Sequence, residues 1–162
     1  MNHPLVIILM GSSADLAHSQ KIAEAAQALG LSVVQRIGSA HKTPAHVLAM
    51  LEAYEADPRP KVYITVAGRS NALSGFVDGA VTAPVIACPP PSESFGGADI
   101  YSSLRMPSGI APALVLEPVN AALLAAKILA PHDPAVQQRL LEFRHQQIAK
   151  ILTDDDNQKA QA

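Results

Sequence analysis

Short apolar runs alternate with helix-like segments along most of this chain, and this alternation is the feature that most restricts its fold. The run from Leu5 to Met10 is continuous and apolar, as is typical of a strand covered on both faces. Apolar residues then recur at helical spacing from Asp15 to Leu29, and Gly30 provides a stop signal. The first unit is therefore predicted to be a strand, a loop and a helix.

The same pattern recurs further along the chain. Thr43 is expected to cap the second helix, with Pro44 in its first turn, where a missing N–H group costs no hydrogen bond. Strands that alternate with helices form a parallel sheet with right-handed crossovers. We therefore predict a three-layer α/β fold with a doubly wound parallel sheet, flavodoxin-like or Rossmann-like. The later strands are expected at residues 31–37, 62–66, 85–87 and 113–116, and the later helices from residue 43 and at 72–80, 100–104 and 120–129.

One domain is predicted for residues 1–130, followed by an additional C-terminal helix within residues 131–152 and a polar, disordered tail at 153–162. Pro131 and Pro134 break the chain before this helix, which has no following strand. Hydrophobic residues make up 49% of the sequence and charged residues 16%, which is more apolar surface than a small lone domain easily hides. We therefore expect a homo-oligomer, with the C-terminal helix packed on a neighbouring subunit.

Charge and cysteine content argue against several classes of partner. The formal net charge of -2 provides no basic field for a phosphate backbone, so no nucleic-acid partner is expected. Cys88 is the sole cysteine; we expect it to be buried after a strand, with no disulfide and no clustered metal site. The first apolar run is too short for a signal peptide or a membrane span. These features predict a cytoplasmic protein with no membrane partner.

Three loops that should follow the first three strands are rich in small and polar residues: residues 11–15, 39–42 and 68–71. In a parallel sheet, ligands bind beyond the carboxyl ends of the strands. Each of these loops opens a helix whose first N–H groups can hold an anion, which favours a phosphorylated small molecule. For any single loop, the alternative is an ordinary turn with a capping aspartate.

One histidine, His41, is expected inside such a loop, where a side chain with a pKa of about 6.5 suits proton transfer. Lys42 beside it suits a phosphate or carboxylate partner. The sequence has no P-loop, dinucleotide-binding, serine-hydrolase or zinc-protease signature, which leaves acid/base chemistry on a bound anion. The histidines expected on helices or their flanks, in solvent, are His18, His46, His132 and His145.

Four motifs occur in order: Gly11-Ser-Ser-Ala-Asp15, Ser39-Ala-His-Lys-Thr-Pro44, Ala67-Gly-Arg-Ser-Asn71 and Ser103-Leu-Arg-Met-Pro-Ser-Gly109. Together they resemble the class II aminoimidazole ribonucleotide carboxylases of purine biosynthesis, over about residues 5–129. The related class I enzymes are mutases, in which the second loop typically reads Ser-Ala-His-Arg and the third is a run of Gly and Ala. Lys42 and the segment Arg69-Ser-Asn71 depart from that pattern and favour class II.

The resemblance implies a carboxy-lyase that carboxylates 5-aminoimidazole ribonucleotide with free carbon dioxide, reversibly, without ATP, cofactor or metal. His41 would remove the ring proton after the carbon–carbon bond forms, and return it in the reverse direction. Lys42 would lie near the phosphate, and family members assemble as homo-octamers, although a tetramer is also open. The substrate-binding residues that the resemblance implies are Gly11, Ser12, Ser13, Asp15, Ser39, Lys42, Gly68, Arg69, Ser70 and Asn71.

Two alternative functions remain open from the sequence. The first is the class I reaction, in which a mutase moves the carboxylate of N5-carboxyaminoimidazole ribonucleotide from nitrogen to carbon. The second is a non-catalytic nucleotide-binding module with the same fold, in which His41 has no chemical role.

Overall fold

The computed structural model of the chain describes residues 3–160 and contains one five-stranded sheet in the order β2-β1-β3-β4-β5. Every neighbouring pair of strands is parallel. The strand order reverses between β1 and β3, as in flavodoxin-like folds, and this reversal marks the usual ligand crevice. The predicted doubly wound sheet is confirmed. Its strands are β1 (Leu5–Met10), β2 (Ser32–Ile37), β3 (Lys61–Val66), β4 (Val85–Ala87) and β5 (Ala113–Leu114).

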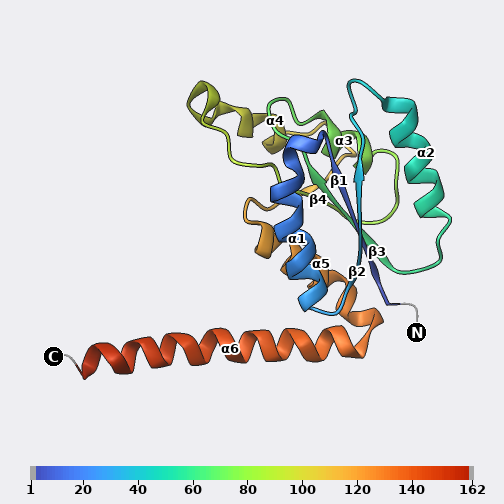
Figure 1. Cartoon of the computed structure of the whole chain (residues 1–162). Coiled ribbons are helices and arrows are strands. Elements are labelled where there is room, and N and C mark those ends of the chain that lie inside the picture. The colour runs from blue at the N-terminus through green and yellow to red at the C-terminus, as the bar shows by residue number, and fades with distance from the viewer. Residues whose placement is uncertain (1–2, 161–162) are drawn as a thin grey trace.

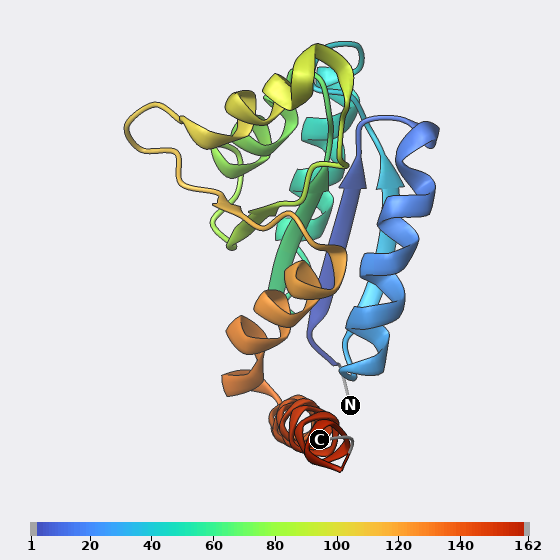
Figure 2. The ribbon, with the colours of Figure 1, turned by 90° about the vertical axis from the view of Figure 1, so that its left-hand side faces the viewer.

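Helices cover both faces of the sheet, which confirms the three-layer arrangement (Figures 1 and 2). Helices α1 and α5 pack on one face, and α2 and α3 pack on the other. The helices are α1 (Leu16–Ala28), α2 (Pro44–Glu55), α3 (Ala72–Asp78), α4 (Tyr101–Leu104), α5 (Pro118–Leu129) and α6 (Pro134–Lys159), with 3-10 turns η1 (Ser13–Asp15), η2 (Ser94–Ile100) and η3 (Ala130–His132).

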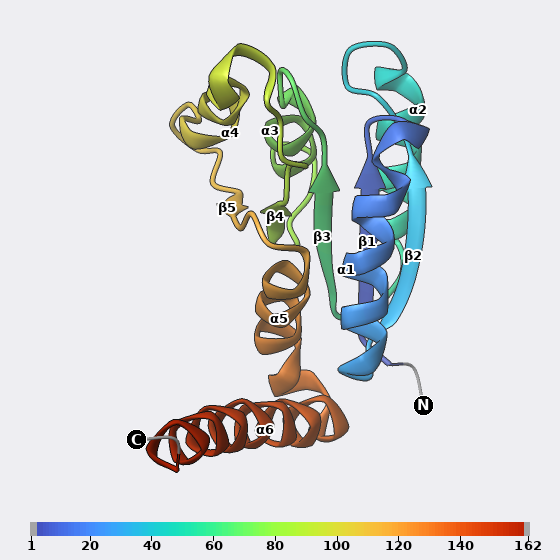
Figure 3. The ribbon, with the colours of Figure 1, turned by 60° about the vertical axis from the view of Figure 1, so that its left-hand side comes forward.

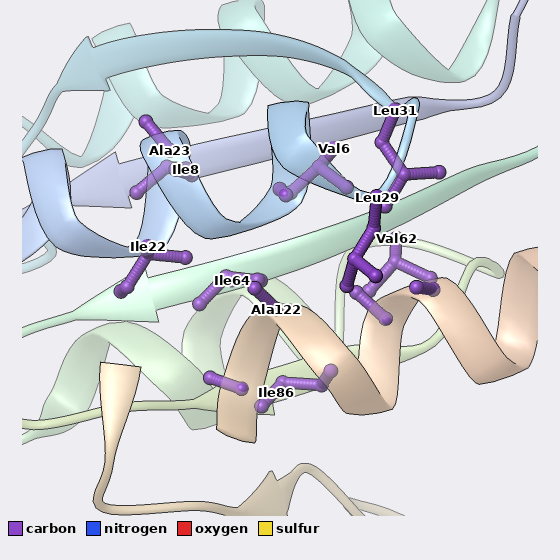
Figure 4. Packing of buried hydrophobic residues seen from close by; sticks show 14 of the residues in the cluster. Val6, Ile8, Ile22, Ala23, Leu29, Leu31, Val62, Ile64, Ile86 and Ala122 are labelled. Atoms are coloured by element: carbon purple, nitrogen blue, oxygen red, sulfur yellow. The ribbon is translucent and has the colours of Figure 1, made fainter. Parts of the chain in front are cut away.

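Alternate residues of the central strands supply the two layers of the core. Ile8 packs in one cluster with Ile22 of α1 and Ala122 of α5, as Figure 4 shows. Its neighbour Ile7 packs in the other cluster, with Val47 of α2. Each fully buried side chain of this size stabilises the fold by about 1.5–3 kcal/mol. The two-sided burial explains why the strands are continuously apolar instead of alternating.

The last helix, α6, packs on the domain only through its beginning. Val136 is fully buried in the cluster beneath α1 and α5, and Leu140 and Phe143 pack partly against the same cluster. Beyond these residues the helix extends away from the rest of the chain (Figure 1). Its second half therefore gains no stabilisation from packing within this chain.

The segment 153–159, which we predicted to be disordered, continues α6 as a helix. The prediction was wrong because polarity alone does not end a helix, and no proline or glycine interrupts this segment. Lys159 also forms salt bridges with Asp155 and Asp156 one turn earlier, a spacing that supports an exposed helix.

Candidate active site

The strands all point towards the end of the molecule where α4 and the connecting loops gather, opposite α6 (Figure 3). A hollow of about 670 Å³ opens there, which is within the usual range for small-molecule sites. Of the predicted site residues, only Ser13 and Asn71 do not line it. Those that the structure brings together in the hollow are Gly11, Ser12, Asp15, Ser39, His41, Lys42, Gly68, Arg69 and Ser70.

The first loop, residues 11–15, is held by a capping box. The Ser12 hydroxyl accepts from the Ala14 N–H group at 3.2 Å, and the Asp15 carboxylate accepts from the Ser12 N–H group at 3.1 Å. The turn is therefore capped, but by Ser12: Asp15 reaches back to the Ser12 N–H group and its side chain does not cap α1. The capping box does not use the whole carboxylate of Asp15. Only Oδ2 takes part, and Oδ1 has acceptor capacity of its own.

The second loop, residues 39–42, is tied back on itself before α2 begins. Thr43 precedes the helix as predicted, with Pro44 in the first turn, but its hydroxyl accepts from the Ser39 N–H group at 3.0 Å instead of capping the helix. The Lys42 N–H group donates to the Ser39 hydroxyl at 3.2 Å. These bonds fold the loop tightly and leave the side chains of His41 and Lys42 exposed at the hollow.

Gly38 allows this loop to lie close to α2. A Cβ atom at this position would come within 2.7 Å of both Val47 and Met50, which is closer than real contacts. Met50 could bend away, but Val47 is fully buried and branched at Cβ, so it has little freedom to move. A larger residue at position 38 would therefore force the second loop and α2 apart.

The third loop, residues 68–71, has a left-handed backbone at Arg69, with φ of 59°. Such a conformation is uncommon outside glycine and persists only where neighbouring contacts enforce it. Asn71 is almost fully buried, and its side chain caps α3 by accepting from the Ser74 N–H group at 3.2 Å. Asn71 is thus buried outside the lining of the hollow, where it supports the third loop.

A fourth loop, residues 88–99, also lines the hollow, and our sequence-based site did not include it. Pro90, Pro91, Ser92, Ser94 and Asp99 face the hollow. The carboxyl-end rule would have found them, because this segment follows β4 just as the other loops follow their strands.

A second cavity of about 530 Å³ lies beside the hollow and shares six lining residues with it, among them Gly68 and Pro90. His18 lines this cavity, with Nε2 3.4 Å from Sγ of Cys88. The prediction that His18 is solvated was wrong, because α1 directs it towards the end of β4, whereas His46, His132 and His145 are exposed as predicted.

The pair formed by His18 and Cys88 is uncharged at neutral pH. Burial raises the pKa of the Cys88 thiol to about 12, with a further contribution from the charge of Glu117. Burial also lowers the pKa of His18 below its usual value. Cys88 is fully buried directly after β4, as predicted, and its thiol is poorly suited to act as a nucleophile.

Between residues 3 and 160, no three His, Cys, Asp or Glu side chains gather in a way that could hold a metal ion. Within the same residues, no helix combines the length and hydrophobicity needed to cross a membrane.

Comparison with known proteins identifies the same family that the sequence motifs suggested. The sequence profile described as AIR carboxylase matches residues 5–150. The chain is 61% identical over 156 residues to a phosphoribosylaminoimidazole carboxylase of Treponema denticola, covering 96% of this chain and 98% of that relative. It is 52% identical over 150 residues to a phosphoribosylaminoimidazole carboxylase of Archaeoglobus fulgidus, covering 93% of this chain and 82% of that relative.

A solved structure agrees with this match at the level of the fold. The crystal structure of Treponema denticola PurE superposes with a TM-score of 0.93 at 61% identity, covering 95% of this chain and 98% of that chain. Sequence and fold thus agree over nearly the whole length. The chain belongs to the AIR carboxylase family.

Proposed function

We propose that this chain carboxylates 5-aminoimidazole ribonucleotide with carbon dioxide, reversibly, to give 4-carboxy-5-aminoimidazole ribonucleotide in purine biosynthesis. The observation that carries the proposal is that His41 shares one hollow with the loops that follow β1 and β3. A proton-transfer group and several anion-binding loops therefore surround a space large enough for a ribonucleotide.

In this proposal, each loop binds a different part of the ribonucleotide. Lys42, which lines the hollow just before α2 begins, provides positive charge for the phosphate. Asp15 can accept hydrogen bonds from ribose hydroxyls through the oxygen that the capping box leaves available. The backbone of Gly68 and Ser70 and the cation of Arg69 border the part of the hollow left for the imidazole and the new carboxylate.

The chemistry then needs only one proton-transfer group. The amino group of the substrate makes the neighbouring ring carbon nucleophilic, and this carbon attacks carbon dioxide to form the new carbon–carbon bond. The resulting tetrahedral carbon still carries a hydrogen, and its loss to neutral His41 restores the aromatic ring. In reverse, protonated His41 returns the hydrogen before carbon dioxide leaves. All electrons remain within the substrate, so no redox partner is required.

Arg69 supports the carboxylase in preference to the mutase. It lines the hollow and adds a cation where the mutase pattern has a small residue, whereas Lys42 keeps the positive charge of the arginine it replaces. A carboxylase takes up neutral carbon dioxide, which becomes a negatively charged carboxylate only as the carbon–carbon bond forms. Fixed cations stabilise that negative charge as it develops.

The test supplies purified protein with 5-aminoimidazole ribonucleotide and carbon dioxide, without ATP. Formation of the carbon-carboxylated product supports the proposal, and product only from N5-carboxyaminoimidazole ribonucleotide would assign the mutase reaction instead. Adding dissolved carbon dioxide or bicarbonate at the start separates the two carbon sources, because they interconvert slowly.

His41→Asn should lower turnover by about two to four powers of ten, since the proton-transfer group is lost. The matched control is His46→Asn on α2, which is also exposed but does not line the hollow and should keep wild-type turnover. Circular dichroism checks that both variants fold. A His41→Asn variant with wild-type turnover would remove the acid/base role and favour the binding-module alternative.

We propose in addition that the chain works as a homo-oligomer, an octamer in preference to a tetramer, in the cytoplasm. Apolar side chains exposed on α6, such as Ile151 and Leu152, support an assembly in which this helix covers a neighbouring subunit. A free cysteine that is fully buried fits a reducing compartment.

A further inference from the structure

The left-handed backbone of Arg69 requires a restraint, and the structure shows where it comes from. The restraint lies in α4, which is distant in the sequence but lies next to the third loop (Figure 3). The Asn71 N–H group donates to the Ser102 hydroxyl at 2.9 Å, and this hydroxyl lies 3.2 Å from the Arg69 carbonyl oxygen. Ser102 thus contacts the backbone on both sides of Ser70.

The same hydroxyl also contacts the end of the fourth loop. It donates to the Asp99 carbonyl oxygen at 2.8 Å, and a hydroxyl has only one hydrogen, so Asp99 and Arg69 share it. The Asp99 carboxylate in turn accepts from the Ser92 hydroxyl at 2.8 Å. One side chain therefore joins two loops that form adjoining walls of the hollow.

The neighbouring residue supports the same loop from below. The Asn71 side-chain amide donates to the Ser103 hydroxyl at 2.8 Å, and both residues are almost fully buried. This bond fixes where the third loop ends and α3 begins. It does not reach Arg69 or the fourth loop, so Ser102 is the residue placed to restrain both.

We infer that Ser102 is a positioning residue for the carboxylation, holding the third loop in its left-handed conformation and tied to the fourth loop. The inference rests on the proposed function, because the substrate is taken to bind in the hollow. Ser102 itself is absent from the lining of the hollow. Its effect on the reaction passes through the main chain of residues 68–71 and through the spacing of the two walls.

The test compares the wild type with Ser102→Ala, which leaves the Asn71 N–H group without its acceptor. We expect kcat/KM for 5-aminoimidazole ribonucleotide to fall roughly tenfold to a hundredfold. The pH profile should keep its wild-type shape, because His41 belongs to the second loop. Hydrogen exchange measured by mass spectrometry should rise in peptides covering residues 67–72 and 92–99, but not in β1.

Two further variants complete the design. Ser102→Thr keeps the hydroxyl and should restore most of kcat/KM, and Ser32→Ala, at the opposite edge of the sheet, should match the wild type. Kinetics of Ser102→Ala within twofold of the wild type, or faster exchange in the third loop alone, would overturn the inference. If Ser102→Ala unfolds, hydrogen exchange rises in β1 too, and the Ser102→Thr variant then provides the test. A loss of kcat/KM in Ser102→Thr as large as that in Ser102→Ala would refute the role of the hydroxyl. An inactive wild type would refute the proposed function, while the exchange comparison would still test the link between the loops.

Discussion

His18 and His41 illustrate how one residue type takes two roles in one fold. His41 follows β2 in an exposed loop at the hollow, where it can meet a ligand. His18 lies one turn into α1 and contacts a buried thiol, so burial lowers its pKa and it remains neutral near pH 7. The tertiary position of each ring, and not its residue type, therefore decides its part in the chemistry.

Cys88 should be inert towards alkylation in the folded protein. A thiol with a pKa near 12 instead of 9 has roughly a thousandth of the thiolate at pH 8, and burial further restricts access. We expect iodoacetamide to leave Cys88 unmodified in native buffer and to modify it readily in denaturing urea, as measured by intact-mass spectrometry. Rapid modification of the native protein would contradict the buried position.

Three elements on one side of the sheet meet at Glu55, the last residue of α2. The Tyr63 hydroxyl of β3 donates to Oε1 of Glu55 at 3.0 Å, and the Thr82 hydroxyl, before β4, donates to Oε2 at 2.9 Å. Burial alone would raise the pKa of Glu55, but these bonds and the Thr82 N–H group outweigh it and lower the pKa. The carboxylate thus joins α2 to β3 and to the turn that precedes β4.

Glu55→Ala should lower the free energy of unfolding by about 1–2 kcal/mol at pH 7, since a buried tyrosine hydroxyl loses its acceptor. Partial exposure of Glu55 keeps the loss small. Because the folded-state pKa is lowered, the stabilisation is complete above the usual glutamate pKa of 4.5 and disappears as the pH falls through the folded value. Urea unfolding at several pH values measures this.

Glu52→Ala provides the control for that experiment, because Glu52 is exposed on the same helix. Its unfolding free energy should stay within about 0.5 kcal/mol of the wild type. An equal loss in both variants would contradict the contact with Tyr63 as the cause, because alanine itself favours a helix and the exposed Glu52 lacks that contact.

At the scale of the whole molecule, the second half of α6 needs a covering surface. Ile148, Ile151 and Leu152 are 47%, 66% and 60% exposed, and they lie on one face of the helix. A long helix with an exposed apolar stripe is stable mainly when that stripe is buried, and no other part of residues 3–160 covers it. This supports contact with a neighbouring subunit.

Replacing Ile148, Ile151 and Leu152 together with glutamine should lower the mass of the assembly in light scattering. The residues are exposed in the single chain, so the domain itself should keep its circular dichroism spectrum. The control replaces Lys150, Thr153 and Asn157, on the opposite face of α6, with alanine and should leave the mass unchanged. An unchanged mass in the glutamine variant would place the subunit contact elsewhere.

The sequence by itself determined the order of elements, the parallel sheet and the loops at its carboxyl edge. These follow from local patterns, because continuous apolar runs need cover on both faces, and parallel strands bring their ends to one edge. The family motifs named His41 and most of the residues that line the hollow.

Only the tertiary structure decided which side chains meet across the chain. Contacts such as His18 with Cys88, or Ser102 with Arg69, join residues 70 and 33 positions apart, and no local pattern encodes such pairings. The helical structure of residues 153–159 also could not be predicted from their polarity, since helix continuation is a cooperative property of the whole segment. Local periodicity fixes elements, whereas packing fixes the distances on which chemistry depends.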